Sequence, residues 1–72
     1  MSGRQFKKQM QKKAYSLSLD HRLDDAAAAQ YKEGKTLLEI GREVFPNESQ
    51  KSKGIVISAV RLFLVDYFAK NR

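Results

Sequence analysis

The chain has no cysteine, no tryptophan and only one proline among its 72 residues. Without cysteine it forms no disulfide bond and no thiolate zinc site, so its stability must come from packing. Its one histidine, His21, has no convincing nucleophile beside it, and no phosphate-loop or dinucleotide glycine pattern occurs. We therefore expect no enzyme, no cofactor, no metal site and no small-molecule substrate.

Long apolar runs are also missing. The most apolar stretch, 55–68, is shorter than the ~20 residues that cross a bilayer, and it contains Arg61 and Asp66. No extended apolar segment follows the basic start, as a secretory signal would require. We expect a protein that does not insert into membranes and that works in the cytoplasm.

Positive charge is unevenly distributed along the chain. The 14 lysines and arginines outnumber the 8 acidic residues, which gives a formal net charge of +6. The first 13 residues contain no acid and hold the basic side chains Arg4, Lys7, Lys8, Lys12 and Lys13. Such a segment is typical of an arm that binds phosphates or, in the plainer interpretation, of a solvated tail. We expect residues 1–13 to form a flexible basic arm and residues 14–72 to form one domain.

The segment after the arm alternates in polarity. In residues 14–19 (AYSLSL) the large apolar side chains occupy every second position, and alanine or serine occupies the others. A period of two predicts a short β-strand with one apolar face and one small, polar face.

Two short helices are predicted after this strand. Asp20 precedes an alanine-rich helix as its N-cap, and Gly34 ends that helix. Thr36, with Glu39 three residues later, predicts a capping box for a second helix that runs to Pro46. Residues 46–49 then predict a turn.

The last helix, from residue 49 or 52 to 69, is apolar on nearly all sides. Only Ser58, Arg61 and Asp66 are polar between residues 55 and 68. Such a helix must be covered nearly all round, and the rest of so short a chain offers little cover. The same helix of a second subunit is the simplest cover, so we expect a homodimer whose core contains Ile55, Val56, Ala59, Val60 and Phe63.

Two short motifs resemble the ribbon-helix-helix family of DNA-binding proteins. They are residues 15–19 (YSLSL) and the start of the last helix, 52–60 (SKGIVISAV), and they cover less than half of the chain. Residues 35–50 depart from the family, which joins its two helices by a short turn. The resemblance implies a mainly α fold with one N-terminal β-strand and, in this chain, an extra short helix between the two family helices. It also implies a homodimer that pairs its strands into an antiparallel ribbon, and this ribbon enters the major groove of DNA.

The resemblance also implies the residues of a DNA site. Base contacts would come from Ala14, Ser16 and Ser18, while Tyr15, Leu17 and Leu19 would face the dimer core. Phosphate contacts would come from the start of the last helix and from the arm, that is from Ser52, Lys53, Gly54, Arg4, Lys7, Lys8, Lys12 and Lys13. The implied protein binds specific double-stranded DNA as a small transcriptional repressor or a plasmid or phage accessory factor, and its dimers could stack on tandem sites.

Two other interpretations stay open. In the first, residues 36–69 form a helix-turn-helix whose Ser52, Lys53 and Arg61 face DNA, although its recognition helix is very apolar for an open surface. In the second, the chain is a dimeric helical adaptor that binds another protein through exposed apolar surface, and the basic arm is incidental.

Overall fold

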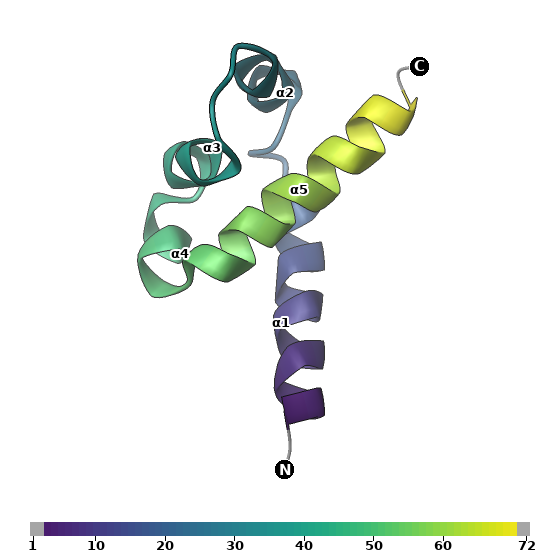
Figure 1. Cartoon of the computed structure of the whole chain (residues 1–72), viewed down its shortest axis with the longest axis vertical. Coiled ribbons are helices and arrows are strands. Elements are labelled where there is room, and N and C mark those ends of the chain that lie inside the picture. Colours follow the sequence, from purple (N-terminus) through teal and green to yellow (C-terminus); the bar gives the residue numbers. More distant parts are fainter. Residues whose placement is uncertain (1–2, 71–72) are drawn as a thin grey trace.

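Five helices and no strand make up residues 3–70, the part of the chain that the computed structural model describes (Figure 1). They are α1 (Gly3–Ser18), α2 (Asp25–Lys32), α3 (Leu37–Val44), α4 (Pro46–Lys51) and α5 (Lys53–Lys70). The long helix α5 crosses α1, and α2, α3 and α4 lie along one side of α5 (Figure 1). The N-terminal half of α1 extends away from the other helices. Among residues 3–70 no helix is long and apolar enough to cross a membrane.

The strand predicted at residues 14–19 is wrong, and with it the ribbon-helix-helix fold class, because these residues end α1 and lead out of it. A polarity pattern only six residues long also fits a helix, in which Ala14, Leu17 and Ser18 share one face. Ala14 and Ser18 are buried, whereas Tyr15 and Leu19 are 59% and 67% exposed. Ala14 and Ser18 therefore lie on the inner face of a helix together with the half-buried Leu17, whereas Tyr15 and Leu19, which the ribbon needed on its inner face, are exposed.

The predicted boundary between a flexible arm and the domain, at residue 13, falls inside α1. Lysine and glutamine, which dominate residues 5–13, are good helix formers. The last turn of α1 is closed by the Ser18 hydroxyl, which donates to the Tyr15 carbonyl at 2.6 Å. The basic segment is thus continuous with the helix that packs on the domain.

The N-cap of α2 is Asp24, four residues after the predicted Asp20. The Asp24 carboxylate accepts a hydrogen bond from the Ala26 N–H at 3.1 Å. Asp20 instead bonds to Arg22 in the loop between α1 and α2. The predicted helix end is confirmed, because Gly34 follows α2 with a φ of 104°, a conformation that favours glycine.

The capping box predicted for α3 is confirmed. The Thr36 hydroxyl accepts from the Glu39 N–H at 3.1 Å, and the Glu39 carboxylate accepts from the Thr36 N–H at 2.9 Å. The segment predicted as a turn forms α4 instead, and Pro46 begins it, where its fixed φ suits a first helical turn.

The hydrophobic core lies between α5 and the side formed by α2 and α3. Its fully buried side chains are Ile40, Phe45, Val56 and Val60, and Leu23, Ala27, Ala28 and Leu64 complete it. On α5's other side α1 makes the most extensive contact between any two helices of the described chain. Much of the apolar surface of α5 is therefore covered within one chain, and Leu62 and Val65 stay 43% and 64% exposed. The physical reason for expecting a second subunit weakens, and dimerisation stays a prediction.

Candidate functional site

Basic side chains gather where α4 joins α5. Arg42, Lys51 and Lys53 come from three consecutive helices, and Lys12 and Lys13 of α1 line a groove together with Lys51. All five are exposed, and none forms an ion pair with another residue of the described chain. This end of the molecule therefore carries uncompensated positive charge, which attracts polyanions.

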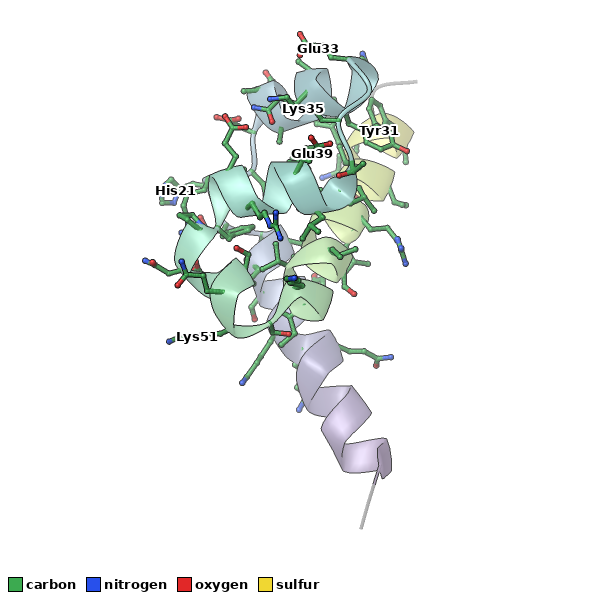
Figure 2. The ribbon with its side chains drawn as sticks, turned by 60° about the vertical axis from the view of Figure 1, so that its left-hand side comes forward. His21, Tyr31, Glu33, Lys35, Glu39 and Lys51 are labelled. Carbon is green, nitrogen blue, oxygen red and sulfur yellow. The ribbon has the colours of Figure 1, made fainter. Side chains whose placement is uncertain are left out.

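The opposite end of the molecule differs in charge. Glu33 and Lys35 lie in the turn between α2 and α3, far from Lys51, which points outward from α4 (Figure 2). There Lys35 is paired with Glu43, with 3.5 Å between Nζ and Oε2. Five unpaired cations thus lie together at one end, whereas Lys32 of α2, which also has no ion pair among the described residues, lies with its Nζ 5.5 Å from the centre of the Phe68 ring.

The first turn of α5 adds to this positive potential. It contains Lys53 and no acidic residue, so nothing offsets the positive end of the helix dipole. The Ser52 hydroxyl caps the helix by accepting from the Ile55 N–H at 3.3 Å. The N–H groups of Lys53 and Gly54 have no hydrogen-bond partner among the described residues. Free amides at a helix start are suited to an anion.

Three cations follow the border between α3 and α5, and we call Arg42, Lys53 and Arg61 the basic edge. Arg42 and Lys53 line a shallow cavity of about 330 Å³ whose remaining lining is Pro46, Ser49 and Gln50. Arg61, about two turns beyond Lys53, lines a second depression together with Leu37 of α3. The edge thus places three positive charges beside both helices.

Gly41 fixes the two helices of the basic edge against each other. A Cβ atom at this position would overlap Val56 Cγ1 and would lie 3.7 Å from Val60 Cγ2. The α3 backbone therefore packs directly on α5, which is possible only because Gly41 has no side chain. Arg42, the next residue, is held at a fixed place relative to α5.

A groove of about 560 Å³ separates α1 from the junction of α4 and α5. Its charged residues are Lys12, Lys13, Lys51 and Glu48, and its apolar residues are Leu17 and Ile55, with Ser16 and Ser52 completing the lining. Leu17 and Ile55 are half-buried. The groove thus combines an apolar wall with three lysines.

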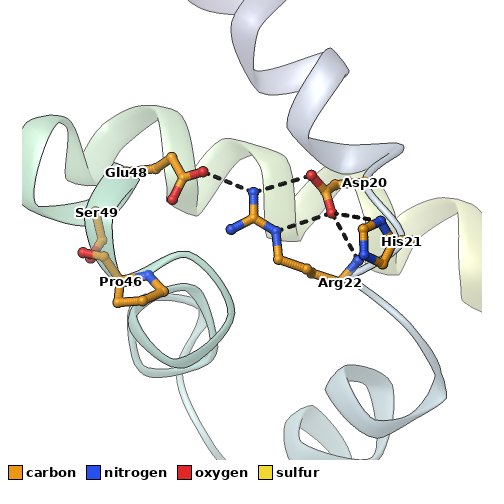
Figure 3. Close-up of polar contacts among 6 residues, drawn as sticks. All are labelled: Asp20, His21, Arg22, Pro46, Glu48 and Ser49. Carbon is orange, nitrogen blue, oxygen red and sulfur yellow. Dashed lines mark hydrogen bonds and ion pairs between the residues drawn. The ribbon is translucent and has the colours of Figure 1, made fainter.

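Arg22 fastens the loop between α1 and α2 to α4 (Figure 3). Its guanidinium donates to both oxygens of Asp20 at 3.1 Å and to Glu48 at 2.8 Å, and it lies 4.5 Å from the centre of the Phe45 ring. These hydrogen bonds lower the pKa of Asp20 from 3.8 to about 2 and also lower the pKa of Glu48. The Glu48 carboxylate is thus committed to Arg22, and the lysines of the groove stay uncompensated.

The predicted site residues are divided among several places. Lys12, Lys13 and Ser52 line the groove, and Lys53 and Gly54 lie in the first turn of α5. Arg4, Lys7 and Lys8 belong to the N-terminal half of α1, and their side chains lie outside the part of the chain that the structure describes.

The residues predicted to contact bases do not share a surface. Ala14 and Ser18 are 2% and 8% exposed, which leaves only Ser16 accessible. Among the predicted dimer core, Val56, Ala59 and Val60 are buried within a single chain, Leu17, Ile55 and Phe63 are half-buried, and Tyr15 and Leu19 are exposed.

Sequence reasoning did not single out Arg42, Lys51 or Gln50 as site residues. Arg42 follows from the helical period of α3, because the apolar positions 37, 40 and 44 leave 42 on the outer face. His21 is exposed, and no cluster of three or more metal-ligating side chains occurs within the described chain. Comparison with family models, with curated protein sequences and with solved structures found no match.

Proposed function

We propose that the chain binds double-stranded DNA through the basic edge, with the first half of α5 in the major groove. The observation that carries this proposal is the set of Arg42, Lys53 and Arg61, which are unpaired within the described chain. Two of them, Arg42 and Lys53, lie beside a helix start that has free amides. The arrangement corresponds to the helix-turn-helix interpretation of residues 36–69, with α4 inserted between its two helices. The ribbon plays no part in it.

The dimensions of the basic edge suit a duplex. Lys53 and Arg61 are eight residues apart on α5, which corresponds to ~12 Å along the helix axis. The major groove is ~12 Å wide and admits one α-helix lengthwise, because a helix with its side chains is ~10–12 Å across. Arg42 and Lys53 would contact phosphates, and Arg61 and the half-buried Ser58 are the side chains that can hydrogen-bond to base edges.

The apolar character of α5 is compatible with this role. Most apolar side chains in the first half of α5 are buried or half-buried, so a polar and basic strip is left at the start of the helix, and the exposed Leu62 and Val65 lie beyond it. We include in the proposal the predicted setting, a cytoplasmic repressor or an accessory factor of a plasmid or phage. The homodimer stays a prediction, which sedimentation at low micromolar concentration tests.

Salt dependence of duplex binding tests the proposal. The affinity for a fluorescein-labelled 20-base-pair duplex, measured by anisotropy between 50 and 200 mM NaCl, should fall steeply because phosphate contacts release counterions. Arg42→Ala and Lys53→Ala should each weaken all duplexes about equally and lower the salt slope by about 1, and Arg61→Ala should also reduce discrimination in a selection from random DNA.

Two variants with the same change of charge serve as controls. Lys35 and Lys70 are paired with Glu43 and Asp66 respectively, away from the basic edge. Lys35→Ala and Lys70→Ala should leave the salt slope unchanged. Absence of binding at 50 mM NaCl, or an equal loss in controls and edge variants, would show that the basic edge is not a DNA site.

A further inference from the structure

The groove between α1 and the α4–α5 junction has a composition unlike that of the basic edge. Its wall is apolar, formed by Leu17 and Ile55, and the stems of Lys12, Lys13 and Lys51 extend that apolar surface while their ammonium groups border it. A volume of about 560 Å³ lies in the range of pockets that accommodate a ligand. The groove can therefore receive aliphatic side chains and carboxylates at the same time.

The electrostatic balance of the groove is positive. Its one acidic residue, Glu48, accepts from Arg22 at 2.8 Å and so is already paired. The three lysines have no ion-pair partner in the part of the chain that the structure describes. An occupant with several negative charges would supply the missing partners.

The apolar wall distinguishes between two kinds of polyanion. Leu17 and Ile55 are half-buried and line the groove beside the three lysines. The sugar-phosphate backbone of DNA has no aliphatic side chains to cover this wall, whereas an amphipathic peptide presents aliphatic side chains together with carboxylates.

We propose that this groove binds an acidic amphipathic helix of another protein. Aliphatic side chains of the helix, spaced by three and four residues, pack on Leu17 and Ile55, and its carboxylates contact Lys12, Lys13 and Lys51. The lysines concerned are not those of the basic edge, so the inference stands independently of DNA binding.

Peptide selection on the full chain tests the inference. Immobilised protein is screened against a displayed library of random 16-residue peptides, and an enriched peptide is synthesised with a fluorescent label. Enriched sequences should carry acidic residues beside aliphatic residues at helical spacing. The labelled peptide should shift the methyl NMR signals of Leu17 and Ile55. Lys13→Glu and Lys51→Glu should each weaken its binding at least tenfold.

Lys53→Glu is the matched control, because it makes the same charge change two residues from Lys51 but outside the groove. It should alter peptide affinity less than twofold. Peptides without acidic bias, or equal losses in Lys51→Glu and Lys53→Glu, would overturn the inference.

Two further outcomes would assign the groove to another occupant and would also overturn it. One is that a 20-base-pair duplex, rather than any peptide, shifts the Leu17 and Ile55 methyl signals. The other is a sedimenting dimer that Lys51→Glu dissociates, which would place a second copy of the chain in the groove. Circular dichroism of each variant verifies that it is folded.

Discussion

Gly41→Ala tests the close contact of α3 with α5. The new methyl group would overlap Val56 Cγ1 and would approach Val56 Cβ to 3.6 Å. Val56 is fully buried and β-branched, so it has little freedom to rotate away inside a helix. Overpacking of this kind costs about 1–3 kcal/mol, and we expect the upper end here.

Helix propensity opposes this loss. Alanine is about 1 kcal/mol more favourable than glycine inside a helix, so the net loss for Gly41→Ala should be about 2 kcal/mol. A domain of this size has a total stability of about 4–11 kcal/mol, so the variant should fold. Its Tm should be lower by about 8–16 °C, because 1 kcal/mol corresponds to about 4–8 °C in small domains.

The assay is urea unfolding followed by circular dichroism, in two backgrounds. Val56→Ala alone removes two buried methyl groups and should cost about 2 kcal/mol or more. In the Val56→Ala background the methyl of Gly41→Ala enters the vacated space, so there the substitution should be neutral or stabilising by up to about 1 kcal/mol. Equal losses in both backgrounds, or stabilisation of the native sequence, would refute the contact of Gly41 with Val56.

Three further substitutions test the cap, the loop and the core. Thr36→Ala removes the acceptor for the Glu39 N–H and should cost about 1 kcal/mol in urea unfolding, whereas Thr36→Ser should cost much less. The pKa of Asp20 is lowered from 3.8 to about 2 by Arg22, so its contribution to stability is complete above about pH 5 and is lost as the pH falls towards 2. The difference in Tm between the native sequence and Arg22→Ala should therefore shrink over that range, and a constant difference would argue against this ion pair. Phe45→Ala empties a fully buried position and should cost about 3–5 kcal/mol, and a loss below about 1 kcal/mol would contradict its burial.

Local signals in the sequence predicted helix boundaries well where a side chain binds the nearby backbone or where the backbone conformation favours glycine. The capping box of Thr36 and Glu39 is the first kind of signal and the stop at Gly34, with its positive φ, is the second, and the structure confirms both. Asp24 and Asp20 are equally good capping residues, so the sequence alone could not decide between them. The choice depends on Arg22, which binds Asp20 and at the same time binds Glu48 of α4. The position of α4 is set by contacts that are distant in sequence from Asp20.

The error at residues 14–19 has a different physical origin. Alanine and serine fit both the polar face of a strand and the contact face of a helix that approaches another helix closely. The contact of α1 with α5 decides between them, since Ala14 and Ser18 are buried there and Ala59 of α5 is also fully buried. The alternation of large and small side chains over six residues contains no information about the helix that packs against them.

The candidate site could be predicted only in part. Lys53 and Gly54 were expected at the start of the last helix, and the structure places them there. The sequence did not predict that Arg42 lies near Lys53, because this proximity depends on how α4 folds back between α3 and α5. The groove combines residues of α1 with others about 40 positions later, and such long-range proximity has no local signal in the sequence.

Single residues join the last three helices. Phe45 ends α3 and starts α4, and Ser52 ends α4 while its hydroxyl accepts from the first turn of α5. One inserted residue in a helical path rotates everything beyond it by about 100°. An insertion or deletion at either joint would turn α5 away from Gly41 and disperse both the basic edge and the groove. Residues 37–70 therefore form one mechanical unit of fixed length, in which substitutions are tolerated far better than changes of spacing.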